Sequence, residues 1–357
     1  MEIGIDSFAA ILPDPATGII PSPSARLANL LEEVEVADQV GLDLFGIGEH
    51  HRPEFLDAAP AIILAAAAAR TRNIRLTSAV TVLSAADPVR VFQEFATIDL
   101  IAKGRAEIVV GRGSFGEAYP LFGLRGEDYD SLFSEKLDLL LKLREATHVR
   151  WSGRYRPALT GQGIYPRPYQ DELPVWVGVG GTPQSFVRAG TLGLPLMVAI
   201  IGGEFRRFRP LVDLYREAGR RAGHSPERLK VGVHAIGFVG ATDEEAKNAF
   251  FPGWQYMFTE IGRERGWSPA TRPQFEAMCG PHGAFLIGDP RTVAAKMLAA
   301  SASLGGVSRM TFQMSSASLE HAAMTRSIQL LGEEVAPLVR KALATMPAPA
   351  DRETIRG

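Results

Sequence analysis

Two adjacent histidines follow an apolar run near the start of the chain. The segment GIGEHHRPEF spans residues 46–55, with Glu49 directly before His50 and His51. An imidazole has an unperturbed pKa of about 6.5, so it accepts or donates a proton near neutral pH. The residue types therefore fit an acid or base, a pair of metal ligands, or a histidine that only fastens a loop.

Strand geometry argues against one metal held by both histidines. Successive side chains of a strand point to opposite faces, so His50 and His51 diverge if the strand continues to its end. A zinc site needs three or four convergent ligands, and the chain has neither an HExxH helix nor an HxH pair after the first strand. We therefore expect no metal site, and the acid–base and loop-fastening interpretations stay open.

The alternation also indicates which face carries His50. Phe45 and Ile47 suit the face that helices cover, which leaves Gly46, Gly48 and His50 on the other face. Glycines leave space there, as a flat ligand would require.

An arginine follows a later apolar strand. Residues 111–116, GRGSFG, match the pattern G-x-G-x-x-G, but no helix opens within them, so the match is attributed to chance. Arg112 is more informative, because a guanidinium at a strand end is costly unless it meets an anion, and its planar fork suits phosphate.

A second candidate anion site lies in GVGGTPQSFVRAG, residues 178–190. Gly180 and Gly181 allow a turn, Thr182 stands where a helix N-cap would be, and Ser185 lies in the first helical turn. Backbone N–H groups at a helix start can cradle a phosphate. An ordinary capped turn explains the same residues, so both interpretations stay open.

The elements that must position these residues alternate between strands and helices. Eight strand-like runs are each followed by a helical pattern, and they lie at residues 2–8, 41–49, 73–83, 105–111, 174–180, 194–201, 228–240 and 308–314. Asp87 and Pro88 suit the N-cap and first position of one of these helices. The alternation predicts an α/β fold, a closed (β/α)8 TIM barrel with its active site at the carboxyl ends of the strands.

Two insertions interrupt the rhythm. Residues 147–157 predict a hairpin after the fourth helix, with its turn at Ser152 and Gly153. Residues 243–288 form a long aromatic-rich insertion after the seventh strand. This insertion fits either a lid over an apolar substrate or a small hydrophobic core under a long loop.

Composition limits the partners and the compartment. The 357 residues are 46% hydrophobic and 22% charged, with a net charge of -2, which gives no footprint for nucleic acid or an anionic membrane. The only cysteine is Cys279, no secretory leader is recognisable, and no apolar run is long enough to span a bilayer, so we expect a cytoplasmic protein. We expect one barrel domain over residues 1–343 and a loose tail over residues 344–357.

Three segments together resemble the bacterial luciferase-like flavin-dependent monooxygenases. They are GIGEHHRPEF, LTSAVTVLSAADPVRVFQEFATIDLIAKGRAEIVVGRGS and PVWVGVGGTPQS, in this order, and the resemblance covers nearly all of residues 1–343. It implies a barrel that holds FMN, or in some branches the deazaflavin F420, with the isoalloxazine ring at the barrel mouth. Light emission does not follow from it.

The resemblance also implies roles for single residues. His50 matches the catalytic histidine that faces the flavin, and Glu49 precedes it as in the family. The cofactor-binding positions fall behind the ring, where the family often has a non-prolyl cis peptide, and around the phosphate: Ser78, Ala79 and Val80, then Arg112, Gly180, Gly181, Thr182 and Ser185. Gly180 and Gly181 stand where the bioluminescent members carry Glu-Ser.

The implied reaction joins reduced FMN and O2 in a flavin C4a-hydroperoxide, which oxygenates a small organic substrate. A separate flavin reductase would supply the reduced FMN, and the family suggests a homodimer. One alternative is an F420-dependent oxidoreductase that transfers hydride on the same barrel. A non-catalytic flavin-binding protein of the same fold is the other alternative.

Overall fold

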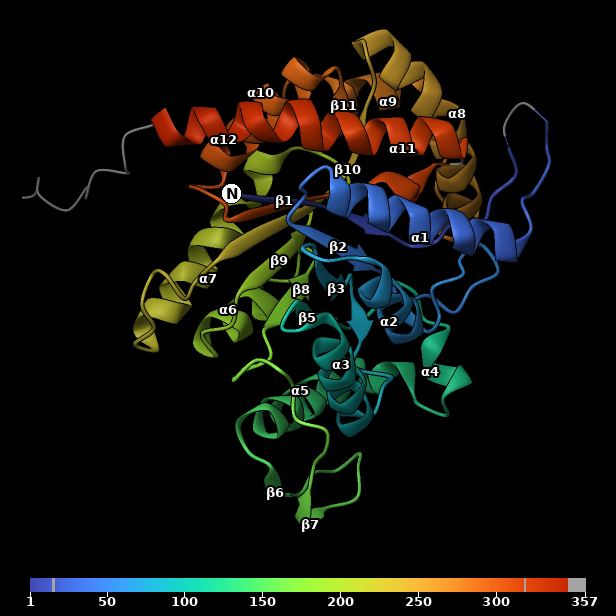
Figure 1. Cartoon of the computed structure of the whole chain (residues 1–357). Coiled ribbons are helices and arrows are strands. Elements are labelled where there is room, and N and C mark those ends of the chain that lie inside the picture. Colours follow the sequence, from blue (N-terminus) through green and yellow to red (C-terminus); the bar gives the residue numbers. More distant parts are fainter. Residues whose placement is uncertain (15–16, 318, 346–357) are drawn as a thin grey trace, which may run out of the picture.

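Eight parallel strands close into a barrel surrounded by helices (Figure 1). The structure is a computed structural model and describes residues 1–14, 17–317 and 319–345. In order around the barrel, the strands are β1 (Glu2–Ser7), β2 (Leu44–Ile47), β3 (Arg75–Ser78), β5 (Ala106–Gly111), β8 (Val175–Val179), β9 (Leu196–Ala199), β10 (Val231–Val239) and β12 (Arg309–Gln313). Pairing of β12 with β1 completes the ring, which confirms the predicted (β/α)8 fold.

Two short strands extend the barrel at its carboxyl end. β4 (Thr81–Val82) pairs with β5, and β11 (Leu286–Gly288) pairs with the end of β10. The strand predicted over residues 73–83 is therefore split into β3 and β4, and a cis peptide between Ala79 and Val80 lies between them.

The helices follow the strands as predicted. They are α1 (Pro23–Gln39), α2 (Pro60–Arg70), α3 (Pro88–Ala102), the short α4 (Ala118–Leu121), α5 (Tyr129–Glu145), α6 (Pro183–Thr191), α7 (Arg209–Arg221), α8 (Asp243–Glu264), α9 (Arg272–Cys279), α10 (Pro290–Ser303), α11 (His321–Leu330) and α12 (Ala336–Thr345). Asp87 caps α3 as predicted, because its carboxylate accepts the N–H groups of Val89 and Arg90.

The last helical run and the tail differ in detail from the prediction. A π-helical turn, Leu331–Val335, joins α11 to α12, and α12 continues to Thr345. The remainder of the predicted tail, residues 346–357, lies outside the described residues. In the described part of the chain, no helix has both the length and the apolar character that crossing a membrane requires.

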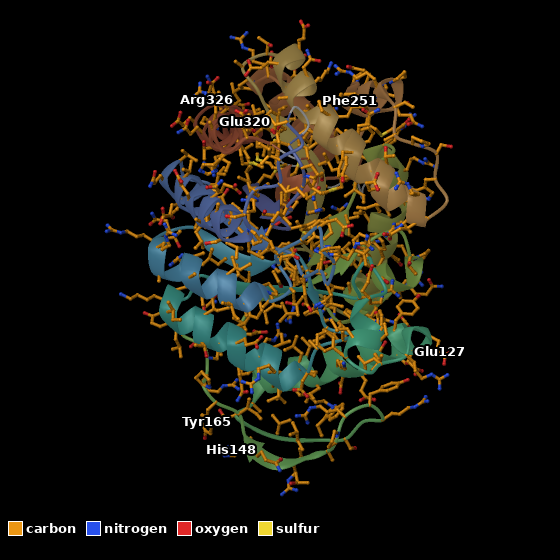
Figure 2. The ribbon with its side chains drawn as sticks, turned by 90° about the vertical axis from the view of Figure 1, so that its right-hand side faces the viewer. Glu127, His148, Tyr165, Phe251, Glu320 and Arg326 are labelled. Atoms are coloured by element: carbon orange, nitrogen blue, oxygen red, sulfur yellow. The ribbon has the colours of Figure 1, made fainter. Side chains whose placement is uncertain are left out.

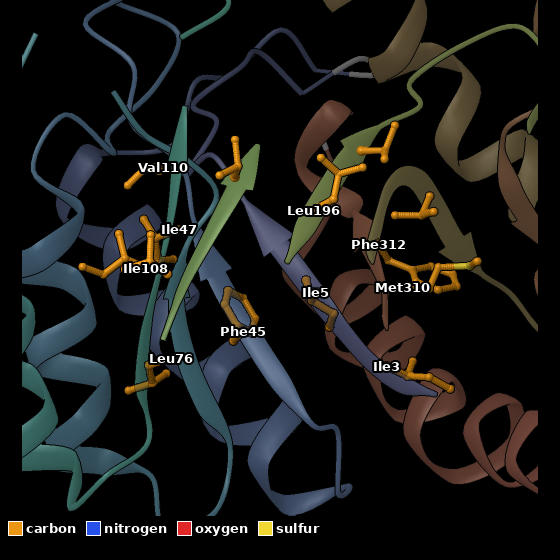
Figure 3. Close-up of a cluster of buried hydrophobic side chains, with 14 of the residues drawn as sticks. Ile3, Ile5, Phe45, Ile47, Leu76, Ile108, Val110, Leu196, Met310 and Phe312 are labelled. Carbon is orange, nitrogen blue, oxygen red and sulfur yellow. The ribbon is translucent and has the colours of Figure 1, made fainter. Parts of the chain in front are cut away.

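The main core lies between the strands and the helices. Figure 3 shows Ile5 of β1 beside Phe45 of β2, with Ile3 and Ile47 of the same strands among the buried side chains. All four are at most 2% exposed, and they share one hydrophobic cluster with helix residues such as Leu64 of α2. Phe45 and Ile47 therefore face the helices, as the alternation predicted.

The predicted hairpin is present, but the prediction placed its second strand too early in the sequence. β6 (His148–Trp151) pairs with β7 (Leu159–Gly163), so residues 152–158 form a loop rather than a tight turn at Ser152 and Gly153. The loop is tied to α5, because Glu135 accepts the N–H groups of Arg154 and Tyr155. Figure 2 shows the hairpin, near His148 and Tyr165, at the end of the molecule opposite Phe251 of α8.

The aromatic-rich insertion is mostly helical, and part of it forms the small hydrophobic core that was one of the two expectations. Phe250 and Trp254 of α8 pack with Phe275 and Phe285 in a second buried cluster. A neighbouring face of α8 carries the side chains that line the main cavity at the barrel mouth, Met257, Phe258 and Ile261.

Candidate active site

A cavity of about 500 Å³ opens at the carboxyl ends of the barrel strands. It brings together most of the site residues that the sequence predicted: Glu49, His50, Ser78, Ala79, Val80, Arg112, Gly180 and Thr182. Gly181 and Ser185 do not line it directly, although Ser185 contacts Arg112. This is the end at which TIM-barrel enzymes carry their active sites.

His50 is held by a buried carboxylate that the sequence analysis missed. Its Nδ1 lies 2.8 Å from Oδ2 of Asp57, whose Oδ1 accepts the backbone N–H of His50 at 3.1 Å. Asp57 is fully buried, and this burial raises the pKa of its carboxyl group, although the hydrogen bond from His50 opposes the rise. With Nδ1 bonded to Asp57, His50 keeps Nε2 for another partner, and no described residue bonds that atom.

The two glycines before His50 serve a different purpose from the one expected. A Cβ atom on Gly46 would lie 2.2 Å from Oδ1 of Asp6, and one on Gly48 would lie 2.5 Å from the Phe8 ring and 2.6 Å from Oδ2 of Asp57. The glycines therefore make room for these side chains, and not for a flat ligand as the sequence suggested.

Glu49 and His51 support the loop around the cavity. One oxygen of Glu49 accepts the backbone N–H of Val82 at 2.8 Å, and the other lies 3.3 Å from Nε2 of His51. The hydrogen bond with Glu49 raises the pKa of His51, although burial opposes it. His51 also packs edge-on against Phe122, and it does not line the cavity. Both oxygens of the predicted catalytic Glu49 are thus engaged by protein groups.

Arg112 and Ser185 meet at the rim of the cavity. The guanidinium of Arg112 donates to the Ser185 hydroxyl at 3.1 Å and to Asp130 at 2.9 Å. Arg188 of α6 donates to the same Asp130 carboxylate, so two arginines share one negative charge. Because one positive charge is left uncompensated within this group, the group favours an anion.

The start of α6, beside this group, offers hydrogen-bond donors. Thr182 stands at the N-cap position, as predicted, but its side chain makes no capping hydrogen bond. A Cβ atom added to Gly180 or Gly181 would meet no atom within 4 Å. An ordinary capped turn would use the Thr182 hydroxyl. Here Pro183 has no N–H and the N–H of Ser185 donates to the carbonyl oxygen of Thr182, so the donor that the first turn offers to a ligand is the N–H of Gln184, beside the open space around Gly180 and Gly181. The residues fit a phosphate group.

The cavity wall beside β3 includes Ala79 and Val80. The peptide bond between these two residues is cis, as the family resemblance implied. Val80 faces Gly111 and Gly178, where an added Cβ would lie 2.5 Å and 2.7 Å from its methyl groups. The hydroxyl of Ser78 both donates to the carbonyl and accepts the N–H of Val109, so it joins β3 to β5 and is fully buried.

A second buried imidazole–carboxylate pair lies in the same cavity, and the sequence analysis missed it too. Nδ1 of His234 lies 2.6 Å from Oδ2 of Asp6, which also accepts the Thr311 hydroxyl. The only available signal was a histidine inside an apolar strand, in VGVHAIGFV, and an aspartate in the first strand. Across the described residues, no group of three or more His, Cys, Asp or Glu side chains is arranged to hold a metal ion.

The chain belongs to the luciferase-like monooxygenase family, whose sequence pattern it matches over residues 1–308. It is 25% identical over 349 residues to 3,6-diketocamphane 1,6-monooxygenase of Pseudomonas putida, covering 85% of this chain and 90% of the relative. It is also 28% identical to the uncharacterized protein y4vJ of Sinorhizobium fredii, a match that spans 63% of this chain and 64% of the relative's length. Both FMN-dependent and F420-dependent proteins occur among the similar proteins.

Solved structures share the fold. The monooxygenase RslO1 from Streptomyces bottropensis superposes with a TM-score of 0.80 at 22% identity, covering 94% of this chain and 99% of that one. The oxygenating constituent of 3,6-diketocamphane monooxygenase from Pseudomonas putida, in complex with FMN, gives 0.75 at 22% identity over 94% and 98%. An F420-dependent secondary alcohol dehydrogenase gives 0.73 at 19% identity over 95% and 100%.

Proposed function

We propose that this protein is a flavin-dependent monooxygenase that uses reduced FMN and O2 to oxygenate a small organic substrate. The observation that carries the proposal is that Arg112, Ser185 and the uncapped start of α6 lie together beside a cavity that is also lined by His50, whose Nδ1 is bonded to the buried Asp57. Reduced FMN, when bound, supplies the electrons that activate O2.

The residues of the chain have separable roles in this proposal. Arg112 and Ser185 hold the phosphate, Ala79 and Val80 back the ring, and His50 gives or takes a proton at Nε2 while Asp57 fixes its orientation. Glu49 acts through the loop that carries His50, because both of its oxygens are engaged. The apolar wall from α8 keeps water from the reacting groups.

Two partners belong to the same proposal. We infer that a separate reductase delivers reduced FMN, because residues 111–116 lead out of β5 into a loop and form no nicotinamide-binding strand–turn–helix unit. A homodimer is supported by apolar side chains exposed on the neighbouring helices α2 and α3, namely Ile62, Leu100 and Ile101.

The first test separates the phosphate site from the ring site. FMN and riboflavin differ only in the phosphate, so R112A should weaken FMN binding by about 10–100-fold and leave riboflavin binding nearly unchanged. Fluorescence titration of each flavin measures this difference. R150A, at an exposed arginine of the hairpin, serves as the control and should change neither affinity.

Three outcomes would contradict the proposal. Equal losses of FMN and riboflavin affinity in R112A would mean that Arg112 does not hold the phosphate. The hydride-transfer alternative is tested by anaerobic titration with reduced F420 in place of FMN. Tight binding of F420 together with no binding of FMN would support that alternative. If FMN binds, no substrate is oxygenated, and bound reduced FMN reacts with O2 at the same rate in H50A as in the parent protein, the chain is a flavin-binding protein only.

A further inference from the structure

The His234–Asp6 pair is a buried polar group that the proposed reaction does not use. His234 lies in the middle of β10 and Asp6 near the end of β1, and they are 8% and 2% exposed. One oxygen of the Asp6 carboxylate, Oδ2, bonds both Nδ1 of His234 and the Thr311 hydroxyl, while Oδ1 lies against Gly46. The carboxylate therefore orients the imidazole.

The remaining ring nitrogen has no protein partner. No hydrogen bond from any described residue reaches Nε2 of His234, and the residue lines the main cavity. The same cavity is also lined by apolar side chains, among them Ile201, Ile236 and Met257. Burying a polar pair among apolar side chains costs free energy unless its hydrogen bonds are complete, and apolar residues of similar volume are often at least as stabilising. Stability alone thus gives no reason for this pair.

The pair lies close to the proposed catalytic histidine. The Phe8 ring stacks on His234 with centroids 5.8 Å apart, and it is tilted against His50 with centroids 4.5 Å apart. Both imidazoles therefore contact the same phenylalanine ring. One small molecule in the cavity can reach His50 and His234 together.

We propose that His234, oriented by Asp6, is a specificity-determining residue that binds a hydroxyl or carbonyl oxygen on an otherwise apolar substrate. A neutral ring with Nδ1–H bonded to Asp6 accepts a hydroxyl proton at Nε2, and a protonated ring donates to a carbonyl oxygen. This inference rests on the proposed function, because it assumes that the substrate occupies this cavity. In this role, His234 favours binding of an oxygen-bearing compound over its hydrocarbon analogue.

The test uses three rigid compounds with one skeleton: adamantane, 2-adamantanol and 2-adamantanone. Their dissociation constants are measured by calorimetry with the FMN-loaded protein. The wild-type protein should bind the alcohol or the ketone about tenfold more tightly than adamantane, as one added hydrogen bond predicts. H234F should bring that ratio close to one. H234Q keeps an amide that can hydrogen-bond, and it should retain part of the preference.

The control is H148F, the same substitution at an exposed histidine of the hairpin, which should leave the ratio unchanged. FMN affinity is measured for the wild-type protein and for every variant. Failure of the wild-type protein to bind FMN would refute the proposed function, independently of the role of His234. Equal binding of the three compounds by the wild-type protein, including no binding of any, overturns the role of His234. A preference that survives in H234F overturns it as well.

Discussion

At the scale of single residues, His50 and Asp57 act as one unit. The Asp57 carboxylate holds both the ring and the backbone N–H of His50, so it sets which ring nitrogen faces the cavity. D57N would present an amide to Nδ1 and favour the other tautomer. The rate of substrate oxygenation should fall by about 10²–10⁴-fold, the range for loss of a positioned acid or base, with FMN affinity retained. Steady-state kinetics with excess reductase measures this, and an unchanged rate would contradict a role for the pair.

Asp57 also sets a pH dependence of stability. Burial raises the pKa of its carboxyl group above 3.8, so the folded protein holds this proton more tightly than the unfolded chain. Its contribution to the free energy of unfolding is therefore fully present below the unfolded pKa and is lost as the pH rises through the raised pKa. D57N cannot ionise and should show no such loss.

Denaturant unfolding of both proteins, from about pH 4 to about pH 8, checks this sign. The free energy of unfolding of the wild-type protein should fall relative to that of D57N as the pH rises. A difference that grows in favour of the wild-type protein would mean that pairing with His50 outweighs the burial of the carboxylate.

The sequence predicted the direction of His50 but not its partner. Strand alternation placed His50 and His51 on opposite faces, and the cavity contains only the first of them. Asp57 lies seven residues beyond His50 in an irregular loop, where no periodicity applies. His234 and Asp6 are 228 residues apart, so only closure of the barrel brings them together. Pattern reasoning within one segment cannot find such pairs.

At the scale of elements, one arginine joins three segments around the cavity mouth. Arg52, in the β2–α2 loop, donates to Glu54 of the same loop, to Glu117 at the start of α4 and to Glu264 at the end of α8. Its guanidinium also lies over Phe115, 4.9 Å from the ring centroid. These carboxylates raise the pKa of Arg52, against the opposing effect of burial.

R52M should therefore loosen the mouth without unfolding the protein. Hydrogen exchange should accelerate severalfold at the amides of residues 113–121 and 258–267, while the melting temperature changes little, because most of the partners are partly exposed. R70M, at the exposed Arg70–Glu35 ion pair, is the control and should leave these amides unchanged. Unaltered exchange in R52M would show that Arg52 does not hold the mouth together.

Element boundaries were less predictable than element types. The N-terminal cap of α3 followed from Asp87 and Pro88 alone, because capping is a local interaction. The position of the second hairpin strand did not follow from the local sequence. The loop before it contacts Glu135 of α5, and the pairing strand is Leu159–Gly163. Contacts between elements decided what the local pattern left open.

At the scale of the whole molecule, an ionic cluster closes the amino-terminal end of the barrel. Arg309 opens β12 and is 0% exposed, as is Glu107 of β5, and Arg309 donates to both oxygens of Glu107 and to Glu2 of β1. Its guanidinium lies 3.9 Å from the centroid of the Trp176 ring of β8. Burial would lower the pKa of Arg309, but Glu107 and Glu2 raise it, so the group stays charged. Because β5 is not adjacent to β12 in the sheet, the pair crosses the barrel interior.

This cluster predicts a large and specific effect on stability. R309M would leave the Glu107 carboxylate buried without its main partner, which should lower the free energy of unfolding by about 3–5 kcal/mol. R309M/E107M removes both charges and should recover much of that loss, since an apolar pair of similar volume needs no desolvation of ions. Denaturant unfolding of the wild-type protein and of the two variants measures these free energies of unfolding. Equal losses in the single and double variants would mean that packing against Trp176, rather than the ion pair, is what Arg309 contributes to barrel closure.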